Sequence, residues 1–374
     1  MNPAVATASS ATATATAAAL LEQQRFDEAF VFWHARYADD APAALAALTA
    51  LARRAVGDHR HQLAASYDAI HCALRRGSRW YPAALGDRLL APPQAPVSSA
   101  RLRHDAMQFQ YLHQLGVLGD EFPPIIARLR LLAGRLEAGQ PHQREFLHAA
   151  QLDDRNASND LDDVYQVYDR IVHLRPTPCV AQALSRHVTP ACQQPGIVVI
   201  DDVLSAAALA ELLRFCQQST VWLRELGHGR LGATYDNGFN CPLLVQLRQL
   251  LDQALGPGHA LLHLGACKHP PRLPGEALHA DQGDLKLQLW LTPDAANLDP
   301  ATGGMFIRAA DGNTRYIGYR QNRAVMFPAR LLHGAAARNF RDDHAGRRID
   351  ITLLYAAQRY STPSARKAAI ASSS

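Results

Sequence analysis

Two histidines and one aspartate in the C-terminal half of the sequence have the types and spacing to bind one metal ion. His279 and Asp281 form the only H-x-D motif of the chain, just before the apolar run LKLQLWL, and His333 follows the run RAVMFPA. Residues i and i+2 of an extended segment lie on one side of the chain, so both side chains can reach the same ion. Two imidazoles and one carboxylate form the facial ligand set of a non-heme Fe(II) site, which keeps other coordination positions open. We therefore predict that His279, Asp281 and His333 are the metal ligands and the catalytic centre.

Three further histidines are alternative ligands because they lie near this motif in the sequence: His263, His269 and His344. None of them has the strand-end position of His333. We therefore prefer His333 as the second imidazole ligand.

An arginine that follows the motif indicates what else binds there. Arg348 opens the strand-like segment RIDITLLY, which comes after His333. A guanidinium that points into a barrel is costly to bury unless it meets an anion, and a carboxylate is its natural partner. A dicarboxylate that chelates the iron at one end and pairs with Arg348 at the other describes 2-oxoglutarate. We therefore expect 2-oxoglutarate and O2 as co-substrates.

The run LKLQLWL has two different faces if it forms a β-strand. Lys286, Gln288 and Trp290 share one face, and the four leucines share the other. The leucine face is expected to pack against a second sheet or a helix, and the polar face is expected to line the pocket. Gln288 and Tyr319, which flanks the next strand, are predicted to contact the co-substrate.

The residues after 195 show patterns of short helices and strands. GIVVIDDVL is a strand signal, SAAALAELLRFCQQ is an amphipathic helix with Ser205 as its N-cap, and PLLVQLRQLLDQAL is a helix closed by Gly256. Six β-like runs then follow: ALLHLGACKH, LKLQLWLTP, GGMFIRA, TRYIGYR, RAVMFPA and RRIDITLLY. Many short strands with turn signals predict a β-sandwich, a jelly roll or a barrel. The turn-rich segment DNGFNCP is interpreted as a surface connection that exposes Phe239.

The residues before 175 have the pattern of helices. The aromatics of the first helix fall on one face: Phe26, Phe30, Trp33 and Tyr37. Further helices are predicted at 43–55, 59–76, 99–116, 120–138 and 158–174. The predicted fold class is therefore α+β, with a disordered tail at 1–18, a helical domain at 19–174, a linker at 175–194, a strand-rich domain with flanking helices at 195–360 and a disordered tail at 361–374.

The order of these motifs resembles a known enzyme family. H-x-D, a GG-containing strand, a distal histidine and then Arg348 are arranged as in the prolyl-4-hydroxylase-like and AlkB-like Fe(II)/2-oxoglutarate dioxygenases. The blocks HADQGDLKLQLWLTPDAANLDPATGG, YRQNRAVMF, LLHGA and RRIDITLLY look more closely like a bacterial subfamily joined to helical, tetratricopeptide-like domains. The resemblance covers about residues 195–358. It implies a double-stranded β-helix (jelly roll) and hydroxylation with release of succinate and CO2. It also implies iron ligands and an anchor for 2-oxoglutarate at His279, Asp281, His333 and Arg348.

One position departs from the family pattern. The residue two after the anchoring arginine is often Asn or Ser in the family, and here it is Asp350. A carboxylate beside the pocket for another carboxylate is repulsive unless it turns away or pairs with Arg347, Arg348 or His344. Arg347 itself is predicted to face solvent, because neighbouring residues of a regular strand point to opposite faces.

Composition argues against several classes of protein. The 374 residues carry a formal net charge of +4, and no block of Lys and Arg indicates nucleic-acid binding. No apolar run approaches the roughly 18 residues of a membrane span, and the N-terminus lacks the pattern of a secretory signal. The six cysteines never form C-x-x-C and are expected to be free thiols. We therefore expect a cytoplasmic protein.

The sequence leaves the substrate open. We expect a small molecule or a peptidyl or carrier-bound residue as substrate, and a protein partner or a homodimer through the helical domain. Two alternatives remain open: a non-catalytic interaction protein with a scaffold barrel, and a cupin-like metal enzyme that does not use 2-oxoglutarate. Binding of Fe(II) and turnover of 2-oxoglutarate distinguish the three.

Overall fold

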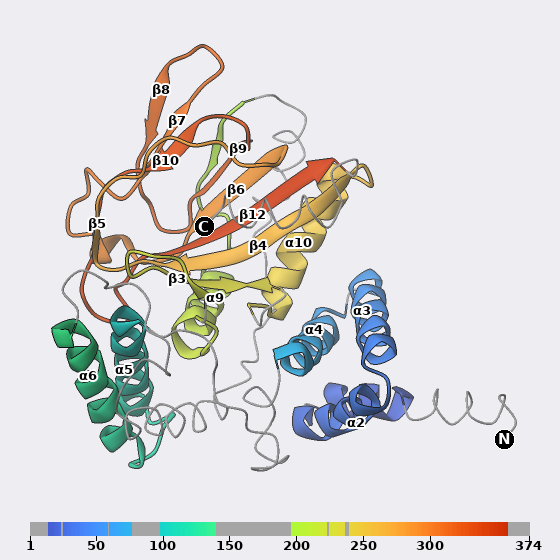
Figure 1. Cartoon of the computed structure of the whole chain (residues 1–374). Helices are drawn as coiled ribbons and strands as arrows, with labels where there is room; N and C mark the ends of the chain where they lie inside the picture. The colour runs from blue at the N-terminus through green and yellow to red at the C-terminus, as the bar shows by residue number, and fades with distance from the viewer. Residues whose placement is uncertain are drawn as a thin grey trace, which may run out of the picture.

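The fold is described by a computed structural model over residues 14–23, 25–58, 60–76, 98–139, 196–222, 224–235 and 239–357 (Figure 1). Three predicted features lie outside these residues: the helix at 158–174, the linker at 175–194 and the tail at 361–374. The predicted disordered tail at 1–18 overlaps a helix, because residues 14–22 are helical. Ala17 and Leu21 of this helix are buried in the apolar cluster of the next helices. Packing thus orders a segment whose composition alone indicates disorder.

Three helices form one bundle near the N-terminus: α2 (Phe26–Asp39), α3 (Ala41–Gly57) and α4 (His61–Arg76). Asp40 caps α3, because its side chain accepts a hydrogen bond from the N–H of Ala43. Pro42 fits the first turn of α3, where no backbone donor is needed. The aromatic face predicted for α2 is confirmed, since the four predicted aromatics belong to one apolar cluster in which Phe30 and Trp33 are fully buried.

A second helical pair, α5 (Ser99–Gln114) and α6 (Phe122–Gly139), has an apolar cluster of its own. Several residues of α5 are polar yet buried: Arg101, His104, Asp105 and Gln108. Buried polar groups are stable only when they are hydrogen-bonded. The Gln108 side chain donates to the carbonyl oxygens of Gln217 and Ser219 at 3.1 and 3.0 Å. These directed bonds hold α5 against the strand-rich part of the chain.

The first helical bundle also contacts the strand-rich part. Val245 of α10 (Pro242–Leu255) belongs to the same apolar cluster as α2, α3 and α4. The Tyr235 hydroxyl donates to Asp68 Oδ2 on α4 at 2.6 Å. The helical part therefore shares apolar packing with the strand-rich part, while the boundary predicted at 175–194 stays a prediction.

The described strands form two main antiparallel sheets and one two-stranded sheet (Figure 1). The large sheet has the order β1-β9-β6-β12-β4-β3-β2, the small sheet has the order β10-β7-β8, and β5 pairs with β11. The strands of the large sheet are β1 (Val198–Ile200), β2 (Arg224–Glu225), β3 (Leu231–Thr234), β4 (His259–Lys268), β6 (Leu285–Trp290), β9 (Ala324–Pro328) and β12 (Ile349–Ala357). The other strands are β5 (Arg272–Leu273), β7 (Met305–Arg308), β8 (Thr314–Ile317), β10 (His333–Ala335) and β11 (Arg338–Asn339), and a short 3-10 helix, η7 (Asp294–Ala296), lies between β6 and β7.

Both faces of the large sheet are covered. Leu287 and Leu289 of β6 pack on one side with α9 (Ala206–Gln218) and α10 in the main apolar core. Trp290 packs with Met305 and Ile307 of the small sheet on the other side. The alternation predicted for LKLQLWL is therefore confirmed, and the polar face of β6 is turned toward the space between the sheets.

The strand order is that of a jelly roll. We count β4, the segment at His279, β6, β7, β8, β9, β10 and β12 as strands one to eight. The core of the large sheet then reads 6-3-8-1 and the small sheet reads 2-7-4-5. The chain thus passes repeatedly from one sheet to the other, as in a double-stranded β-helix. The predicted α+β class with a jelly roll is confirmed for the described residues.

Local signals in this part are mostly confirmed. Ser205 caps α9 through its side chain, and α10 ends before Gly256, whose φ of 73° lies in the left-handed region that glycine tolerates. The predicted exposure of Phe239 is wrong, because its ring is fully buried and lies 5.7 Å from that of Phe215. The turn-forming neighbours of Phe239 indicated a surface loop, but the apolar core outweighs them. None of the described helices is both long enough and apolar enough to cross a membrane.

Two histidines at the contact between α5 and the barrel predict how stability depends on pH. The rings of His104 and His344 lie 5.5 Å apart, and burial, followed by the charge of Lys268, lowers both pKa values well below the usual value. The unfolded chain therefore binds protons near pH 6.5 that the folded chain does not bind. The part of the stability that depends on neutral His104 and His344 is fully present above about pH 6.5. It is lost as the pH falls below that value.

We expect the melting temperature to fall by at least about 2 °C between about pH 7.5 and about pH 5. Circular dichroism at several pH values measures it. The His344→Gln variant, which can still donate to the Gln217 carbonyl, should lose less stability over this range. An equal loss in both proteins would contradict the assignment to His344.

Candidate metal centre and its pocket

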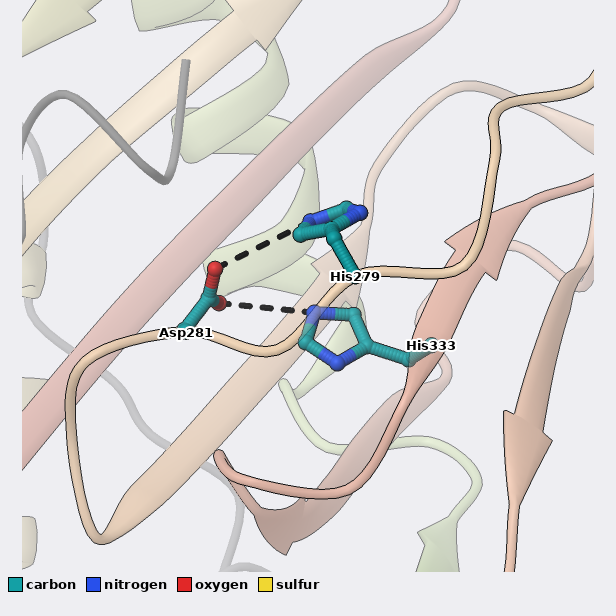
Figure 2. Close-up of side chains that lie close together, drawn as sticks. All are labelled: His279, Asp281 and His333. Carbon is teal, nitrogen blue, oxygen red and sulfur yellow. Dashed lines mark ion pairs between the residues drawn. The ribbon is translucent and has the colours of Figure 1, made fainter.

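The H-x-D motif and the distal histidine meet at the small sheet (Figure 2). His279 and His333 are directly opposed, and the backbone N–H of each donates to the carbonyl oxygen of the other, at 2.9 and 2.8 Å. Side chains of opposed residues lie on the same face of an antiparallel pair, and these two ring centroids are 4.6 Å apart. The N–H of Asp281 donates to the carbonyl of Ala329 at 3.0 Å. Backbone pairing therefore brings all three predicted ligands together.

Their side chains form a compact group of donor atoms. One ligand atom from each of His279, Asp281 and His333 lies within 4.8 Å of the others. The two oxygens of Asp281 lie 3.4 Å from His333 Nε2 and 3.7 Å from His279 Nε2. Within the described ranges no other three His, Cys, Asp or Glu side chains come together in this way. His263, His269 and His344 therefore do not form an alternative group of this kind. That the three residues bind iron stays a proposal.

Hydrogen bonds orient both imidazoles, and burial and charge hold His333 and Asp281 in the protonation states that bind a metal. Nδ1 of His333 and Nδ1 of His279 donate to backbone carbonyls at 2.7 and 3.2 Å, which leaves the Nε2 lone pairs for a ligand role. Burial lowers the pKa of His333 and keeps its ring neutral. Burial alone would raise the pKa of Asp281, but contact with His333 and the charge of Lys286 lower it to about 2. Neutral imidazole and carboxylate are the forms that bind a divalent cation.

Lys286 is an unexpected member of this group. Its Nζ donates to Asp281 Oδ2 at 2.8 Å and to His333 Nε2 at 3.0 Å, and its side chain is 9% exposed. The sequence places Lys286 on the polar face of β6, but nothing in it indicates contact with the ligands. The ammonium group neutralises Asp281 and contacts two of the atoms that a metal ion would use. It must therefore move when a cation takes its place.

Replacing Lys286 with methionine should strengthen metal binding. Methionine keeps an unbranched apolar stem of similar length but carries no charge that competes with the metal. We expect the affinity of the apo-protein for Mn(II) to rise by about tenfold, measured by isothermal titration calorimetry. The Lys286→Arg variant, which keeps the charge, should bind as weakly as the wild type. Weaker binding by the methionine variant would show that Lys286 supports the metal site.

His279 and His333 line a pocket of about 600 Å³ between the two sheets, and Asp281 adjoins it through its bond to Lys286. This volume lies within the roughly 300–1,000 Å³ that is usual for small-molecule sites. Lys286, Gln288 and Trp290 line the pocket, as the alternation of β6 predicts. Gln288 Oε1 accepts a hydrogen bond from Thr352 Oγ1 at 2.9 Å, which fixes the orientation of its amide.

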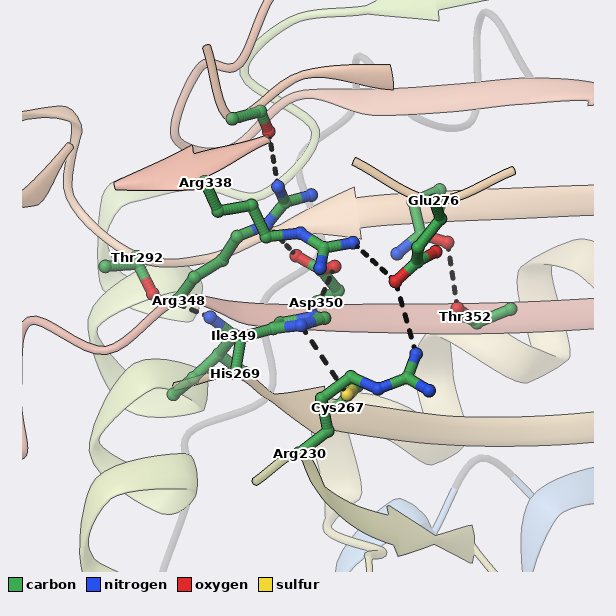
Figure 3. Close-up of polar contacts among 12 residues, drawn as sticks. Arg230, Cys267, His269, Glu276, Thr292, Arg338, Arg348, Ile349, Asp350 and Thr352 are labelled. Carbon is green, nitrogen blue, oxygen red and sulfur yellow. Dashed lines mark hydrogen bonds and ion pairs between the residues drawn. The ribbon is translucent and has the colours of Figure 1, made fainter. Parts of the chain in front are cut away.

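Arg348 lines the same pocket and has Asp350 as its partner (Figure 3). Arg348 Nε donates to Asp350 Oδ1 at 2.7 Å, and its Nη1 donates to the carbonyl of Gly303. The other oxygen of Asp350 lies 2.9 Å from His269 Nε2. Burial alone would raise the pKa of Asp350, but Arg348 and then His269 bring it far below its usual value. The residue that departs from the family pattern thus neutralises the predicted anchor.

Two other predictions change at this end of the pocket. Tyr319 is not among the residues that line the pocket, because its hydroxyl donates to a backbone carbonyl at 2.5 Å and its ring stacks on Trp290. The Tyr319 ring instead supports the guanidinium of Arg348 at 5.3 Å.

The prediction that Arg347 faces solvent is wrong, since it is buried and its Nε donates to the carbonyl of His269 at 3.0 Å. Arg347 precedes the first residue of β12, so strand alternation does not apply to it.

The pocket also contains a charged group that the sequence does not reveal. Glu276 Oε1 accepts from Arg338 Nη2 at 2.9 Å and from Arg230 Nη1 at 3.2 Å (Figure 3). All three residues line the pocket. They come from segments that are distant in the sequence, and no local motif marks them.

Comparison with known proteins gives structural neighbours only. No protein-family model and no curated protein matches the chain. A prolyl hydroxylase from Trichoplax adhaerens, in complex with a hypoxia inducible factor peptide fragment, is 17% identical with a TM-score of 0.36, covering 47% of this chain and 90% of that one. A Pseudomonas putida prolyl-4-hydroxylase is 18% identical with a TM-score of 0.33, covering 50% of this chain and 99% of that one. A 2OG-Fe(II) oxygenase family oxidoreductase from Burkholderia pseudomallei is 11% identical with a TM-score of 0.35, covering 50% of this chain and 94% of that one. At these values the similarity does not determine the activity of this chain.

Proposed function

We propose that the chain is an Fe(II)- and 2-oxoglutarate-dependent oxygenase that hydroxylates a C–H bond of a small metabolite or of a peptidyl or carrier-bound residue. The observation that carries the proposal is the convergence of His279, Asp281 and His333 beside a pocket that His279, His333 and Arg348 line. Two neutral imidazoles and a carboxylate are the donor set of non-heme Fe(II) oxygenases. The pocket then provides room for a chelating co-substrate and a substrate.

The residues present fit such a metal. Asp281 Oδ1 is buried and has no hydrogen-bond partner among the described residues, as expected of an oxygen that is kept for a cation. His279, Asp281 and His333 would hold Fe(II), which together with 2-oxoglutarate and O2 supplies the oxidising power to break a C–H bond, with release of succinate and CO2.

The other residues of the chain orient the reactants and exclude water. Arg348 lies in the pocket wall, where it would bind the distal carboxylate of the co-substrate. Its guanidinium is packed beside the stacked rings of Trp290 and Tyr319, 5.5 and 5.3 Å from their centroids. Gln288, fixed by Thr352, offers an amide to the same ligand. The two sheets would shield the bound reactants from water on opposite sides of the pocket.

Three finer expectations belong to the same proposal. The chain would be a member of the bacterial subfamily joined to a helical domain, it would act in the cytoplasm, and its helical part would bind a protein partner or a second copy. The packing of α5 and α10 against their neighbours shows how the helical part is attached.

A second candidate, a cupin-like metal enzyme that does not use 2-oxoglutarate, is favoured by one observation. Asp350 already occupies Arg348 at 2.7 Å, so the predicted anchor has a carboxylate partner from the chain itself. Such an enzyme would bind iron and would not respond to 2-oxoglutarate.

Anaerobic titration of the apo-protein with Fe(II) and then 2-oxoglutarate tests the proposal. We expect a weak visible charge-transfer band that requires both additions and disappears in the His279→Ala variant. Bound iron without the band would favour the cupin-like enzyme. Absence of bound iron would favour a scaffold protein and contradict both enzymes.

A further inference from the structure

Arg338 is a buried cation with unused hydrogen-bond donors. Its side chain is 1% exposed, and Nη2 donates to Glu276 Oε1. Nε and Nη1 of Arg338 are buried and have no hydrogen-bond partner in the described part of the chain. A buried guanidinium with unsatisfied donors is costly, so its presence requires an explanation. A ligand that accepts hydrogen bonds would supply one.

Arg338 belongs to the same pocket as Arg348. Both side chains line it, and Figure 3 shows the Arg338 guanidinium beside Glu276 and close to Asp350. Its charge acts on this end of the pocket, because burial and then the charge of Arg338 lower the pKa of His269 to about 4. His269 is therefore neutral at physiological pH, and it is the partner of Asp350. The cations available to an anion here are thus guanidinium groups.

The two carboxylates of this region are already in use. Asp350 pairs with Arg348, and Glu276 is shared between Arg338 and Arg230. A distal carboxylate that binds beside Arg348 would also meet the negative charge of Asp350. A second guanidinium with free donors would offset this repulsion.

We propose that Arg338 and Arg348 bind the distal carboxylate of the 2-oxo acid co-substrate together, and that Glu276 weakens this binding because it shares Arg338. The inference rests on the proposed function and deepens it. It makes Arg338 the residue that selects a dicarboxylic 2-oxo acid over a monocarboxylic one. It also explains how the pocket can accept 2-oxoglutarate although Asp350 neutralises Arg348.

The test compares two ligands that differ only in the distal carboxylate. The full-length Fe(II)-loaded protein is titrated anaerobically with 2-oxoglutarate and with 2-oxopentanoate, and the charge-transfer band reports binding of each. In the Arg338→Gln variant we expect 2-oxoglutarate to bind at least about tenfold more weakly, because a charge-assisted hydrogen bond is lost. Binding of 2-oxopentanoate should stay within about twofold of the wild-type value.

A second variant predicts the opposite change. Glu276→Gln removes the charge that competes for Arg338, so 2-oxoglutarate should bind about three- to tenfold more tightly while 2-oxopentanoate is unaffected. A structural defect would not tighten binding. Arg341→Gln is the matched control, since Arg341 is half-exposed and pairs with Asp343 outside the pocket.

Each result decides the inference. Selective loss in Arg338→Gln together with a gain in Glu276→Gln supports it. If Arg338→Gln binds 2-oxoglutarate like the wild type, or loses both ligands equally, or if Glu276→Gln shows no gain, the inference is overturned while the oxygenase proposal stands. If the wild-type protein binds iron but neither 2-oxo acid, both are overturned.

Discussion

The His333→Ala variant is expected to lose metal binding. His333 is one of the three proposed ligands, and its Nδ1 bond to the Leu331 carbonyl at 2.7 Å holds Nε2 toward Asp281. Loss of a group that only orients a ligand typically costs 10–100-fold in metal affinity, so loss of the ligand itself should exceed about 100-fold. Without metal, 2-oxoglutarate has nothing to chelate. The charge-transfer band and all 2-oxoglutarate turnover should disappear with the metal.

Metal content after anaerobic loading and desalting measures the effect directly. The His228→Ala variant is the matched control, because His228 lines the same pocket but is not one of the three converging residues. We expect His228→Ala to retain stoichiometric iron. If His333→Ala also retains it, His333 is not a ligand, and the metal site is elsewhere or needs only two of these residues.

The Arg348→Ala variant is expected to lose both stability and co-substrate binding. Removal of the Arg348 guanidinium leaves Asp350 as a buried carboxylate, whose remaining partner is the neutral His269. Breaking a buried ion pair by removing one partner typically costs about 3–5 kcal/mol in unfolding free energy. The distal carboxylate of 2-oxoglutarate would lose its main cation, and it would meet Asp350 uncompensated.

A double variant separates these two effects. Arg348→Ala with Asp350→Ala removes both charges and should recover most of the lost stability in urea unfolding, since no unpaired charge is left. It should not recover 2-oxoglutarate affinity. Recovered binding in the double variant would assign the anchoring role to Arg338 alone, and unchanged binding in Arg348→Ala would support the cupin-like enzyme.

The arrangement of Arg348, Asp350 and Arg338 has a consequence for how the pocket is charged before any ligand binds. Asp350 neutralises Arg348, and Glu276 partly neutralises Arg338. At the proposed metal centre, the ammonium group of Lys286 neutralises Asp281. These internal pairs lower the cost of folding the pocket without metal or co-substrate, because its charges largely compensate one another. Ligands then enter by displacing or sharing these internal partners.

Much of the architecture could be predicted from the sequence because it depends on local patterns. The alternation in LKLQLWL, the cap at Ser205 and the glycine after α10 involve residues close together in the chain, and the structure confirms all three. The spacing of H-x-D also brought His279 and Asp281 to one side of an extended segment. Errors arose where tertiary packing outweighed local composition, as at Phe239 and Ala17, which are both buried.

Only the tertiary structure decided what surrounds the predicted ligands. The contacts of Lys286 with His333, of Asp350 with His269 and of Glu276 with Arg338 join residues on separate strands or loops. The strength of such pairs depends on distance and burial, and neither quantity is written in the local sequence. The sequence by itself determined which residues could bind the metal, because ligand chemistry and strand geometry are local properties. The charge balance of the pocket was decided by folding, because it depends on which distant side chains the two sheets bring together.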